Sequence, residues 1–384
     1  MAAEQLSPMS ASPVQLLPDP GVAAVADAPA IRVGVIGYGY WGPNVVRNFA
    51  EVAGAQVWAV SDTSQERLAL ARVRYPAITT TTDCHTLIAD PAIDAVVIMT
   101  PVSTHFELAR EALRAGKHVL VAKPLASSAK EASELIDEAE RHRRVLMIDH
   151  TFIYTGAVRR IKELVDSGTL GRLYYYDSVR VNLGLFQHDV NVLWDLAVHD
   201  LAIMDYVLGE QPCAVAATGA AHIPGHPVNM AYLTCFFDNE LIAHHHVNWL
   251  APLKVRRTLI CGDRQMIVYD DLEPSEKVKV YDKGVTLNGS PERVYESLIG
   301  YRTGDMWAPK LSLTEGLRVE AQHFLECIRQ GRQPLSDGQS GLRVIRVLEA
   351  AVKSLEQRGR PVELSAIHQP RRRAPRAVMT RQAV

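Results

Sequence analysis

The sequence predicts an α/β protein, in which a doubly wound parallel sheet of the Rossmann type precedes an α+β domain with an open, mainly antiparallel sheet. Between residues 31 and about 150, short apolar runs alternate with segments of helical periodicity, which is typical of βαβ units. After residue 150, apolar runs follow one another without helices between them, which favours antiparallel pairing. A glycine-rich turn after the first apolar run supports the Rossmann assignment.

The first part contains five apolar runs that predict buried parallel strands. Segments with helical spacing, such as HFELAREALRAG and ASELIDEAERHRR, separate them and would cover both faces of the sheet. The runs are IRVGVI (31–36), AQVWAVS (55–61), DAVVIMT (94–100), HVLVAK (118–123) and VLMID (145–149). We therefore assign residues 31–150 to a dinucleotide-binding domain.

The second part, residues 151–364, is expected to bind substrate and to mediate oligomerisation. Its helices are predicted at about 157–166, near 190–208, and at about 313–329 and 339–357; the last two can pack back on the first domain. Its strands are predicted at 172–182, 214–220, 230–237, 241–249, 255–262, 265–271 and 277–282. Residues 1–30 and 365–384 are expected to be disordered tails.

Composition disfavours several classes of partner. The 384 residues are 47% apolar and 22% charged with a formal net charge of −2, so no basic field draws the chain to nucleic acid or an anionic membrane. No run approaches the roughly 18 apolar residues of a membrane span. The five cysteines are scattered without a CxxC, and residues 1–30 contain no Lys or Arg, so we expect a cytoplasmic protein.

The turn GYGYWG, residues 37–42, follows the first predicted strand and precedes a helix. Gly37 allows the tight turn, Gly39 lets the backbone approach a pyrophosphate, and Gly42 permits close helix packing. Phosphates then lie at the helix N-terminus, where free N–H groups favour an anion. Tyr38, Tyr40 and Trp41, between the glycines, are further candidate cofactor contacts.

The second predicted strand ends at Asp62, 20 residues past Gly42. A carboxylate there accepts hydrogen bonds from the adenosine ribose and repels a 2′-phosphate, so NAD is favoured over NADP. Arg67, one turn further, would favour NADP if it turned toward the site. The alternative is a glycine-rich turn followed by a capping aspartate.

Lys123 lies where the strand HVLVA ends, and Pro124 stops the ladder because it lacks an N–H group. In doubly wound sheets, ligands bind beyond this end of the strands. A second motif, WDLAVHD (194–200), places Asp195 and His199 at i and i+4 of a predicted helix, so both can point into one cleft. Asp200 faces away and is expected to make a separate cap or salt bridge. A solvated lysine and a structural Asp–His pair remain the alternatives.

Together, GYGYWG, TPVSTH (100–105), AGKHVLVAKP (115–124) and WDLAVHD resemble the Gfo/Idh/MocA oxidoreductase family, named after glucose-fructose oxidoreductase, inositol dehydrogenase and a rhizopine-catabolism protein. The resemblance covers about residues 31–364. The run RVNLG (180–184), the helix VLWDLAVHD and YRTGD (301–305) are similar to the branch that acts on nucleotide-linked sugars, including the 3-dehydrogenases of UDP-N-acetylglucosamine and its uronate.

The resemblance implies roles for particular residues. Lys123, His199 and Asp195 correspond to the family's catalytic lysine, histidine and aspartate, and Thr100, Pro101 and His105 belong to a cofactor-side motif. One position departs from the family, which usually has glutamate before the lysine where this chain has Ala122. That change would alter the pKa of Lys123, loosen a contact near the nicotinamide ribose, or be neutral.

The implied reaction moves a hydride between nicotinamide and a secondary hydroxyl or ketone carbon of a sugar, at C3 by resemblance. His199, whose ordinary pKa is about 6.5, would act as the base. Lys123 would polarise the oxygen and Asp195 would orient His199. Arg180, Asn182 and Tyr154 are candidates to hold the sugar or its phosphates, with exposed positions on a sheet face as the alternative.

Two other functions remain open: an NAD-dependent glycoside hydrolase that oxidises C3 transiently, and a non-catalytic NAD- or sugar-binding protein. No metal is expected, because His244, His245 and His246 alternate faces in a strand and cannot converge on one ion. An open antiparallel sheet has a face to cover, so we expect a homodimer or homotetramer. The expected partner is otherwise a small sugar or nucleotide sugar.

Overall fold

The apolar runs of the first domain form neighbouring strands of one parallel sheet in the computed structural model, which describes residues 29–184, 190–287 and 299–364. Apart from Pro29 and Ala30, the two predicted tails lie outside the described residues. The strands are β1 (Ile31–Ile36), β2 (Ala55–Ser61), β3 (Thr79–Thr81), β4 (Ala95–Ile98), β5 (His118–Ala122) and β6 (Leu146–Asp149). Their order, β3-β2-β1-β4-β5-β6, reverses between β1 and β4, the point where doubly wound sheets bind ligands.

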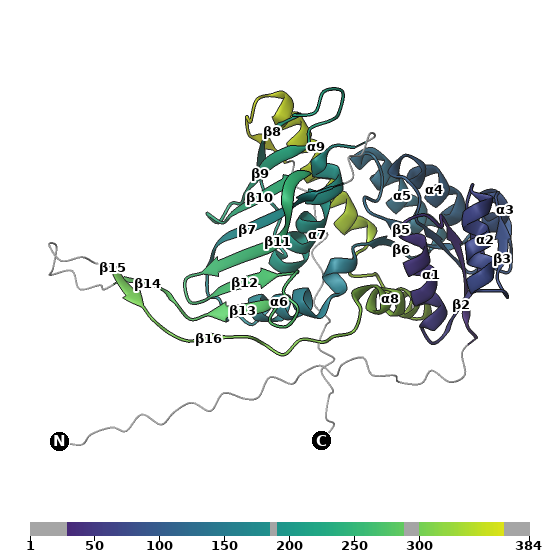
Figure 1. Cartoon of the computed structure of the whole chain (residues 1–384), viewed down its shortest axis with the longest axis horizontal. Helices are drawn as coiled ribbons and strands as arrows, with labels where there is room; N and C mark the ends of the chain where they lie inside the picture. The colour runs from purple at the N-terminus through teal and green to yellow at the C-terminus, as the bar shows by residue number, and fades with distance from the viewer. Residues whose placement is uncertain (1–28, 185–189, 288–298, 365–384) are drawn as a thin grey trace, which may run out of the picture.

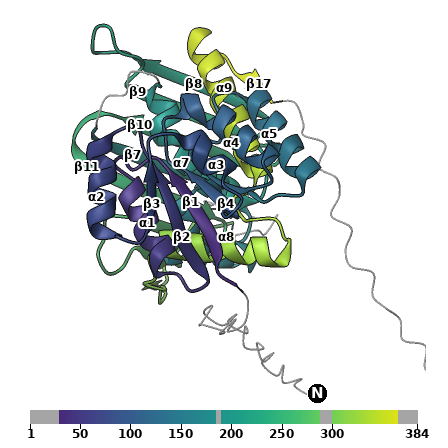
Figure 2. The ribbon, with the colours of Figure 1, turned by 90° about the vertical axis from the view of Figure 1, so that its right-hand side faces the viewer.

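Helices cover both faces of this sheet (Figure 2), as the alternation of apolar runs with helical segments in the sequence predicts. The helices are α1 (Gly42–Glu51), α2 (Gln65–Arg74), α3 (Cys84–Ala89), α4 (His105–Arg114) and α5 (Ala129–His142), with a 3₁₀ turn η1 (Val102–Thr104) before α4. Side chains of α1 and α2 form one apolar core with the sheet, and those of α3, α4 and α5 form a second core on the opposite face.

The second domain is built on a nine-stranded sheet (Figure 1). Its strands are β7 (Leu173–Leu183), β8 (Ala214–Ala220), β9 (Met230–Phe236), β10 (Ile242–Asn248), β11 (Leu250–Gly262), β12 (Met266–Asp270), β13 (Val278–Tyr281), β16 (Met306–Trp307) and β17 (Val362–Glu363). A separate ribbon of β14 (Gly284–Leu287) and β15 (Ile299–Arg302) extends from it. The pairing is mainly antiparallel, although β10 and β7 run parallel, so the fold class is confirmed.

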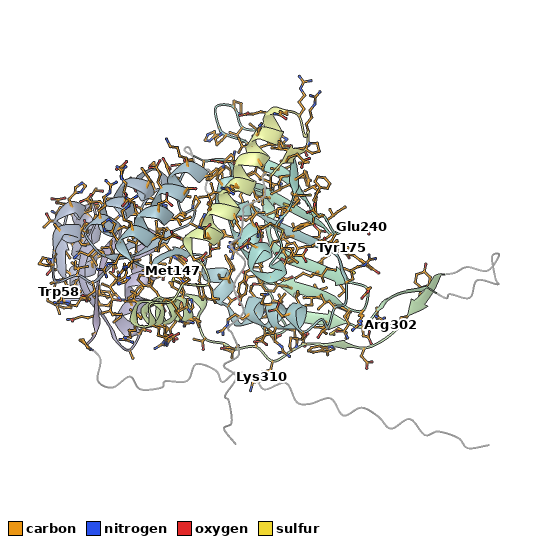
Figure 3. The ribbon with its side chains drawn as sticks, turned by 180° about the vertical axis from the view of Figure 1, so that it is seen from behind. Trp58, Met147, Tyr175, Glu240, Arg302 and Lys310 are labelled. Carbon is orange, nitrogen blue, oxygen red and sulfur yellow. The ribbon has the colours of Figure 1, made fainter. Side chains whose placement is uncertain are left out.

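One face of the large sheet packs on helices and the other is open. The helices are α6 (Gly156–Asp166), α7 (Val198–Leu208), α8 (Gly316–Gln330) and α9 (Gly338–Glu356), with η2 (Thr151–Tyr154) and a π-helical turn η3 (Leu193–Ala197). Helices α6, α7 and α9 share an apolar core with the sheet. The open face carries exposed Tyr175, Tyr232 and Ile242. Figure 3 shows Tyr175 at the side of the molecule remote from Trp58 in the first domain.

The two closing helices also pack on the first domain. Phe324 of α8 meets Phe49 of α1 edge to face with ring centres 6.3 Å apart. Leu342 and Ile345 of α9 belong to the core formed by α3, α4 and α5. These shared cores hold the two domains together, so residues at their junction have fixed positions. No helix in the described ranges combines the length and hydropathy needed to cross a bilayer.

Candidate active site

The glycine turn between β1 and α1 has the space that a dinucleotide needs. Gly37 has φ +98°, and a Cβ there would lie 2.4 Å from the Met99 carbonyl oxygen. A Cβ on Gly42 would lie 2.4 Å from the Gly37 carbonyl oxygen, so both positions require glycine. At Gly39 the nearest atom would be Nη1 of Arg67, 3.6 Å away, so its outer side is open. The turn therefore fits a pyrophosphate above Gly39 and the start of α1.

Asp62, directly after β2, braces this turn. Its Oδ2 accepts a 2.6 Å hydrogen bond from the backbone N–H of Tyr38, and its Oδ1 accepts one of 2.8 Å from Ser64. The exposed Arg67 lies with Nη1 3.7 Å from Oδ2. A carboxylate has about four acceptor sites, so Asp62 retains capacity for ribose hydroxyls.

The three aromatic residues of the turn have different environments. The Tyr38 ring is buried in the core, whereas Tyr40 is 92% exposed. The indole Nε1 of Trp41 donates a 2.9 Å hydrogen bond to Oδ2 of Asp149 at the end of β6. Hydrogen bonds therefore join the turn to the carboxyl ends of β2, through Asp62, and of β6, through Asp149. The sequence motifs did not indicate Asp149.

His105 holds together two loops at this edge. It is 1% exposed, with Nδ1 2.8 Å from the Pro124 carbonyl oxygen and Nε2 2.8 Å from the Thr100 carbonyl oxygen. Burial lowers its pKa. Thr100 is half-buried and Pro101 exposed, so these two are accessible to a cofactor, whereas His105 acts through the loops that it joins.

Lys123 emerges where β5 ends, as predicted, and meets the second domain. Its Nζ donates hydrogen bonds to the Asp195 carbonyl oxygen at 2.9 Å and to Asp195 Oδ1 at 3.1 Å. The other carboxylate oxygen of Asp195 accepts a 3.0 Å hydrogen bond from the indole of Trp249. The structure therefore brings the predicted lysine and aspartate together across the domain junction.

His199 lies beside this pair, half-buried, with its ring edge to face on Phe152 at 5.2 Å between ring centres. Burial, followed by the positive charges of Lys123 and Arg180, lowers its pKa well below 6.5. The expectation of an ordinary histidine pKa is therefore wrong. The imidazole is neutral at neutral pH, which is the form that accepts a proton.

The expected partnership between Asp195 and His199 differs from the arrangement found. Asp195 pairs with Lys123 and Trp249, and no hydrogen bond joins it to His199 in the described part of the chain. The reason is local geometry: Asp195 lies in the π-helical turn η3, whereas His199 lies in α7. The regular i,i+4 spacing of an α-helix does not extend through a π turn.

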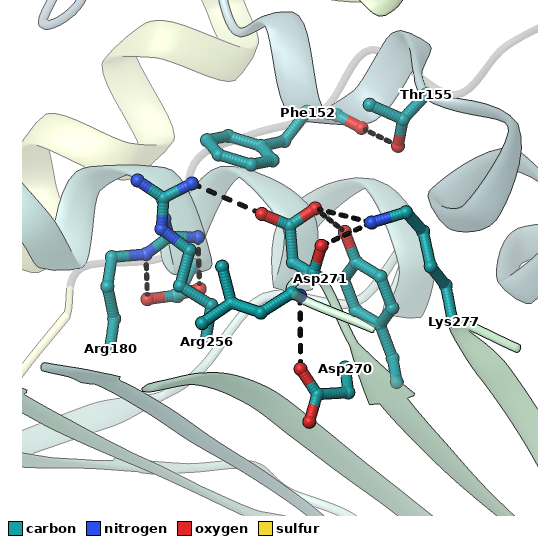
Figure 4. Close-up of polar contacts among 10 residues, drawn as sticks. Phe152, Thr155, Arg180, Arg256, Asp270, Asp271 and Lys277 are labelled. Carbon is teal, nitrogen blue, oxygen red and sulfur yellow. Dashed lines mark hydrogen bonds and ion pairs between the residues drawn. The ribbon is translucent and has the colours of Figure 1, made fainter. Parts of the chain in front are cut away.

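Arg180, proposed from sequence to hold the substrate, instead forms a buried salt bridge with another residue of the protein. Its Nε and Nη2 donate to the two carboxylate oxygens of Asp200 at 2.8 and 2.9 Å, and both side chains are buried. The separate salt bridge predicted for Asp200 is thereby confirmed. Arg180 also lies 4.6 Å from the centre of the Phe152 ring, so it supports the wall of the site (Figure 4).

Arg256, which motif analysis missed, is the accessible arginine of this wall. It is paired with Arg180 across β11 and β7, so both side chains extend from the same face of the sheet (Figure 4). Its Nη1 donates to Asp271 Oδ2 at 3.1 Å, and 29% of its side chain is exposed. Its charge contributes to the lowered pKa of His199. The sequence could have indicated this position, because Arg256 lies at i and the buried Thr258 and Ile260 at i+2 and i+4 of β11, on the same face of the strand.

The two remaining candidate substrate-binding residues, Asn182 and Tyr154, have different environments. Asn182 is half-buried on the face of β7 that also carries Arg180, which leaves it near the site. Tyr154 is 1% exposed, and its hydroxyl hydrogen-bonds to the Ser336 side chain at 2.8 Å. Tyr154 is therefore part of the packing between η2 and the segment before α9, and does not line the cleft.

The three consecutive histidines alternate faces as predicted. His245 is fully buried and lies 2.7 Å from the Ser178 hydroxyl, while His244 and His246 stack on Tyr232 on the open face. In the described ranges, one group of three metal-type ligands comes together, the consecutive Asp83, Cys84 and His85 at the start of α3. It is remote from Lys123 and His199 in the fold.

Comparison with known proteins identifies the class. Residues 31–150 match the NAD-binding Rossmann domain of the Gfo/Idh/MocA oxidoreductase family, and residues 162–364 match its C-terminal alpha/beta domain. The chain therefore belongs to this family, and it is an NAD-binding oxidoreductase.

Particular relatives act on different substrates. The chain is 29% identical to UDP-N-acetylglucosamine 3-dehydrogenase of Acidithiobacillus ferrooxidans over 85% of its length and 99% of the relative. It is 24% identical to myo-inositol 2-dehydrogenase of Thermotoga maritima over 88% of its length and 99% of the relative. A solved structure of UDP-N-acetylglucosamine 3-dehydrogenase from A. ferrooxidans superimposes with a TM-score of 0.71 at 26% identity, covering 86% of this chain and 99% of that one.

Proposed function

We propose that this protein is an NAD-dependent dehydrogenase or ketoreductase that acts at C3 of a nucleotide-linked sugar. The observation that carries the proposal is the hydrogen-bonded contact of Lys123, directly after a strand of the first domain, with Asp195 of the second domain, close enough to His199 for the Lys123 charge to lower its pKa. Bound NAD would supply the hydride acceptor or donor. Gly37, Gly39, Gly42, Asp62 and Thr100 are the residues that would hold it.

The residues of the chain would handle the proton and the substrate oxygen. Neutral His199 takes the hydroxyl proton as hydride leaves the neighbouring carbon. The Lys123 ammonium donates a hydrogen bond to the same oxygen and stabilises negative charge that develops there. Asp195, held by Trp249, keeps Lys123 in place. For ketone reduction each proton moves in the opposite direction.

The charge around His199 favours an anionic substrate. After burial, the cations Lys123, Arg180 and Arg256 lower the pKa of His199, so several positive side chains lie near it. Arg180 is neutralised by Asp200, which leaves the partly exposed Arg256 to meet a substrate anion. A guanidinium binds phosphate or carboxylate through paired N–H groups. The diphosphate of a nucleotide sugar or the carboxylate of a uronate has this chemistry.

The relatives leave two substrate classes to distinguish. One relative is named for UDP-N-acetylglucosamine and another for the uncharged polyol myo-inositol. The cations near His199 favour the charged class for this chain, because a guanidinium binds an anion more strongly than an uncharged hydroxyl group. Asp62 at the expected ribose position favours NAD as the cofactor.

A substrate panel with NAD tests the proposal. UDP-N-acetylglucosamine, its uronate, a dTDP-sugar and myo-inositol would each be mixed with protein and NAD while NADH absorbance and keto product are followed. We expect NADH with a nucleotide sugar and little with myo-inositol. Faster reaction with myo-inositol would assign a polyol dehydrogenase, and sugar cleavage without net NADH would assign a glycoside hydrolase. NAD binding without turnover of any substrate would leave a binding protein.

Two further proposals concern assembly and location. The open face of the large sheet, with Tyr175, Tyr232 and Ile242 exposed, supports a homodimer or homotetramer that covers it. Light scattering of the purified protein would measure this. All five cysteines are free, which agrees with a reducing compartment such as the cytoplasm.

A further inference from the structure

A cavity of about 170 Å³ lies beside α7, whose residues Ala202, Asp205 and Tyr206 form part of its wall. It is bounded by η2, α6, α7 and α9, and exposed Gly209 and Leu335 form part of its rim. His150, which is 3% exposed, is among its lining residues. One water takes about 30 Å³ of liquid, so the cavity has room for several water molecules.

His150 is the unusual member of this lining. Neither ring nitrogen has a hydrogen-bond partner among the described residues, although the ring is buried. Buried polar groups in folded proteins are nearly always hydrogen-bonded to protein or to ordered water. Because His150 lines a cavity with a rim at the surface, water in that cavity is the available partner.

His150 also adjoins the proposed active site. It directly follows β6, whose last residue, Asp149, is paired in the sheet with Ala122 beside Lys123. Two residues after His150, the ring of Phe152 in η2 makes an edge-to-face contact with the His199 ring. The charges of His150 and His199 are close enough to interact, since a proton on His150 disfavours one on His199. His150 therefore lines the cavity and also lies near His199, the proposed base.

Oxidation of an alcohol requires a route by which the proton taken up by the base can reach solvent. Each turnover moves one proton from the substrate hydroxyl to His199, and that proton must reach solvent before the next turnover. While nicotinamide and sugar cover the cleft, the outward route from His199 is closed. A second route on the protein side would allow release with the cleft filled.

We propose that His150 and the water in this cavity relay the proton between His199 and solvent. The proton that His199 releases passes through an intervening water to one ring nitrogen of His150, and the other nitrogen gives a proton to cavity water, so the ring returns to its neutral state. Reduction of a ketone uses the same path inward. This inference rests on the proposed role of His199 as the base.

The charges that face His150 suit transient protonation. Burial lowers its pKa to about 4, so it is neutral at rest, while the carboxylates of Asp149 and Asp205 favour the proton when it arrives. Asp205 itself is paired with Arg343 of α9 at 2.7 and 2.8 Å. The other charged or titratable groups around the ring are Lys123 directly after β5, Lys162 on α6, His199 and Tyr206 on α7, and Glu320 on α8.

The test compares proton release with hydride transfer in the full-length protein. UDP-N-acetylglucosamine and NAD would be mixed with His150→Phe and His150→Gln in weak buffer containing a pH indicator, and NADH and proton release followed by stopped flow. We expect normal cofactor binding and KM, a kcat lower by about tenfold or more, proton release that lags behind NADH, and recovery of kcat with added imidazole. Loss of the base itself would cost more, roughly 100-fold or above.

His245→Gln is the matched control, because His245 is an equally buried histidine that contacts Ser178 away from the cavity. Ala202→Leu, which fills the cavity wall without touching His150 chemistry, is the second variant and should also slow proton release. Unchanged kcat and proton release in folded His150→Gln and Ala202→Leu would overturn the relay. If the wild-type protein forms no NADH with any sugar of the panel, the proposed function fails instead, which is a separate result.

Discussion

The ammonium of Lys123 donates hydrogen bonds to both the backbone carbonyl oxygen and the carboxylate of Asp195, at 2.9 and 3.1 Å. These two residues are 72 positions apart and belong to different domains. Trp249 holds the other carboxylate oxygen, so Asp195 is fixed from both sides. The contact joins the lysine to the second-domain segment that leads into α7, the helix that carries His199.

Changing Asp195 to Asn removes the charge that faces Lys123 but keeps the side-chain shape. Hydrogen bonds to charged groups contribute about 1.5–3 kcal/mol, so we expect kcat to fall by at least about tenfold. Steady-state kinetics would measure the change. Asp177→Asn, on the open sheet face beside His244, is the control and should leave kcat unchanged. Wild-type turnover in Asp195→Asn would exclude the pair from the reaction.

Replacing His199 with Asn removes the proposed base. We expect kcat to fall roughly 100- to 10,000-fold while KM changes little, since the base acts mainly in the transition state. The lowered pKa of His199 also predicts that wild-type kcat stays constant as pH falls to 6.5 and decreases only at lower pH, where the imidazole is protonated. A pH–rate profile would check this. A decrease beginning above pH 7 would contradict the lowered pKa.

Arg180→Gln is expected to damage folding more than binding. The variant leaves Asp200 as a buried carboxylate without its cation, which costs roughly 3–5 kcal/mol. Urea unfolding would measure the loss. Arg180→Lys, which keeps the charge but not the paired N–H groups, should recover part of it. Stability equal to wild type would show that Arg180 is not a structural residue.

Arg256→Gln is expected to show the opposite pattern. Its ion pair with Asp271 is partly exposed and contributes about 0–1 kcal/mol, so unfolding should change little. KM for UDP-N-acetylglucosamine should rise by about tenfold or more, because the guanidinium that meets the substrate anion is gone. An uncharged polyol should show no such increase. Equal effects on charged and uncharged substrates would exclude Arg256 from anion recognition.

Glu320→Gln is expected to stabilise the protein at neutral and alkaline pH. Glu320 is fully buried in α8, and neither oxygen has a hydrogen-bond partner among the described residues. Burial and the nearby Asp149 raise its pKa well above 4.5. Since the unfolded group ionises near 4.5, the wild-type protein loses stability as pH rises through the raised folded pKa, whereas the glutamine variant does not. Thermal unfolding at pH 5 and pH 8 should show the difference growing with pH.

Ala122→Glu tests the departure from the family motif. Ala122 is paired in the sheet with Asp149, so a glutamate there would add a second carboxylate beside the first. We expect turnover to change by less than about tenfold, equal to 1.36 kcal/mol in the barrier. Ala122→Gln separates the effect of charge from that of size. A rise of several orders of magnitude in Ala122→Glu alone would show that wild-type Ala122 limits catalysis.

Local sequence patterns predicted five of the six strands of the first domain, and missed β3, whose three threonines form no apolar run. The period of each apolar run, the three glycines and Pro124 act through backbone geometry that depends on a few neighbouring residues, and the structure agrees at each. The same is true of the alternation that buries His245 and exposes its two neighbours. In the second domain β7 to β13 were predicted, but the short strands β14 to β17 were not. The parallel pairing of β10 with β7 was also not predicted, because it joins segments far apart in the chain.

The sequence by itself determined the fold class, the dinucleotide turn, the position of Lys123 at the end of a strand and that of His199 on a helix, since periodicity, chirality and turn chemistry are local. Only the tertiary structure decided the partners: Asp195 for Lys123, Asp200 for Arg180, and Arg256 as the exposed cation of the cleft. Charges find partners according to distance and burial in space. A π turn and a nine-stranded sheet set those distances through packing that no single motif encodes.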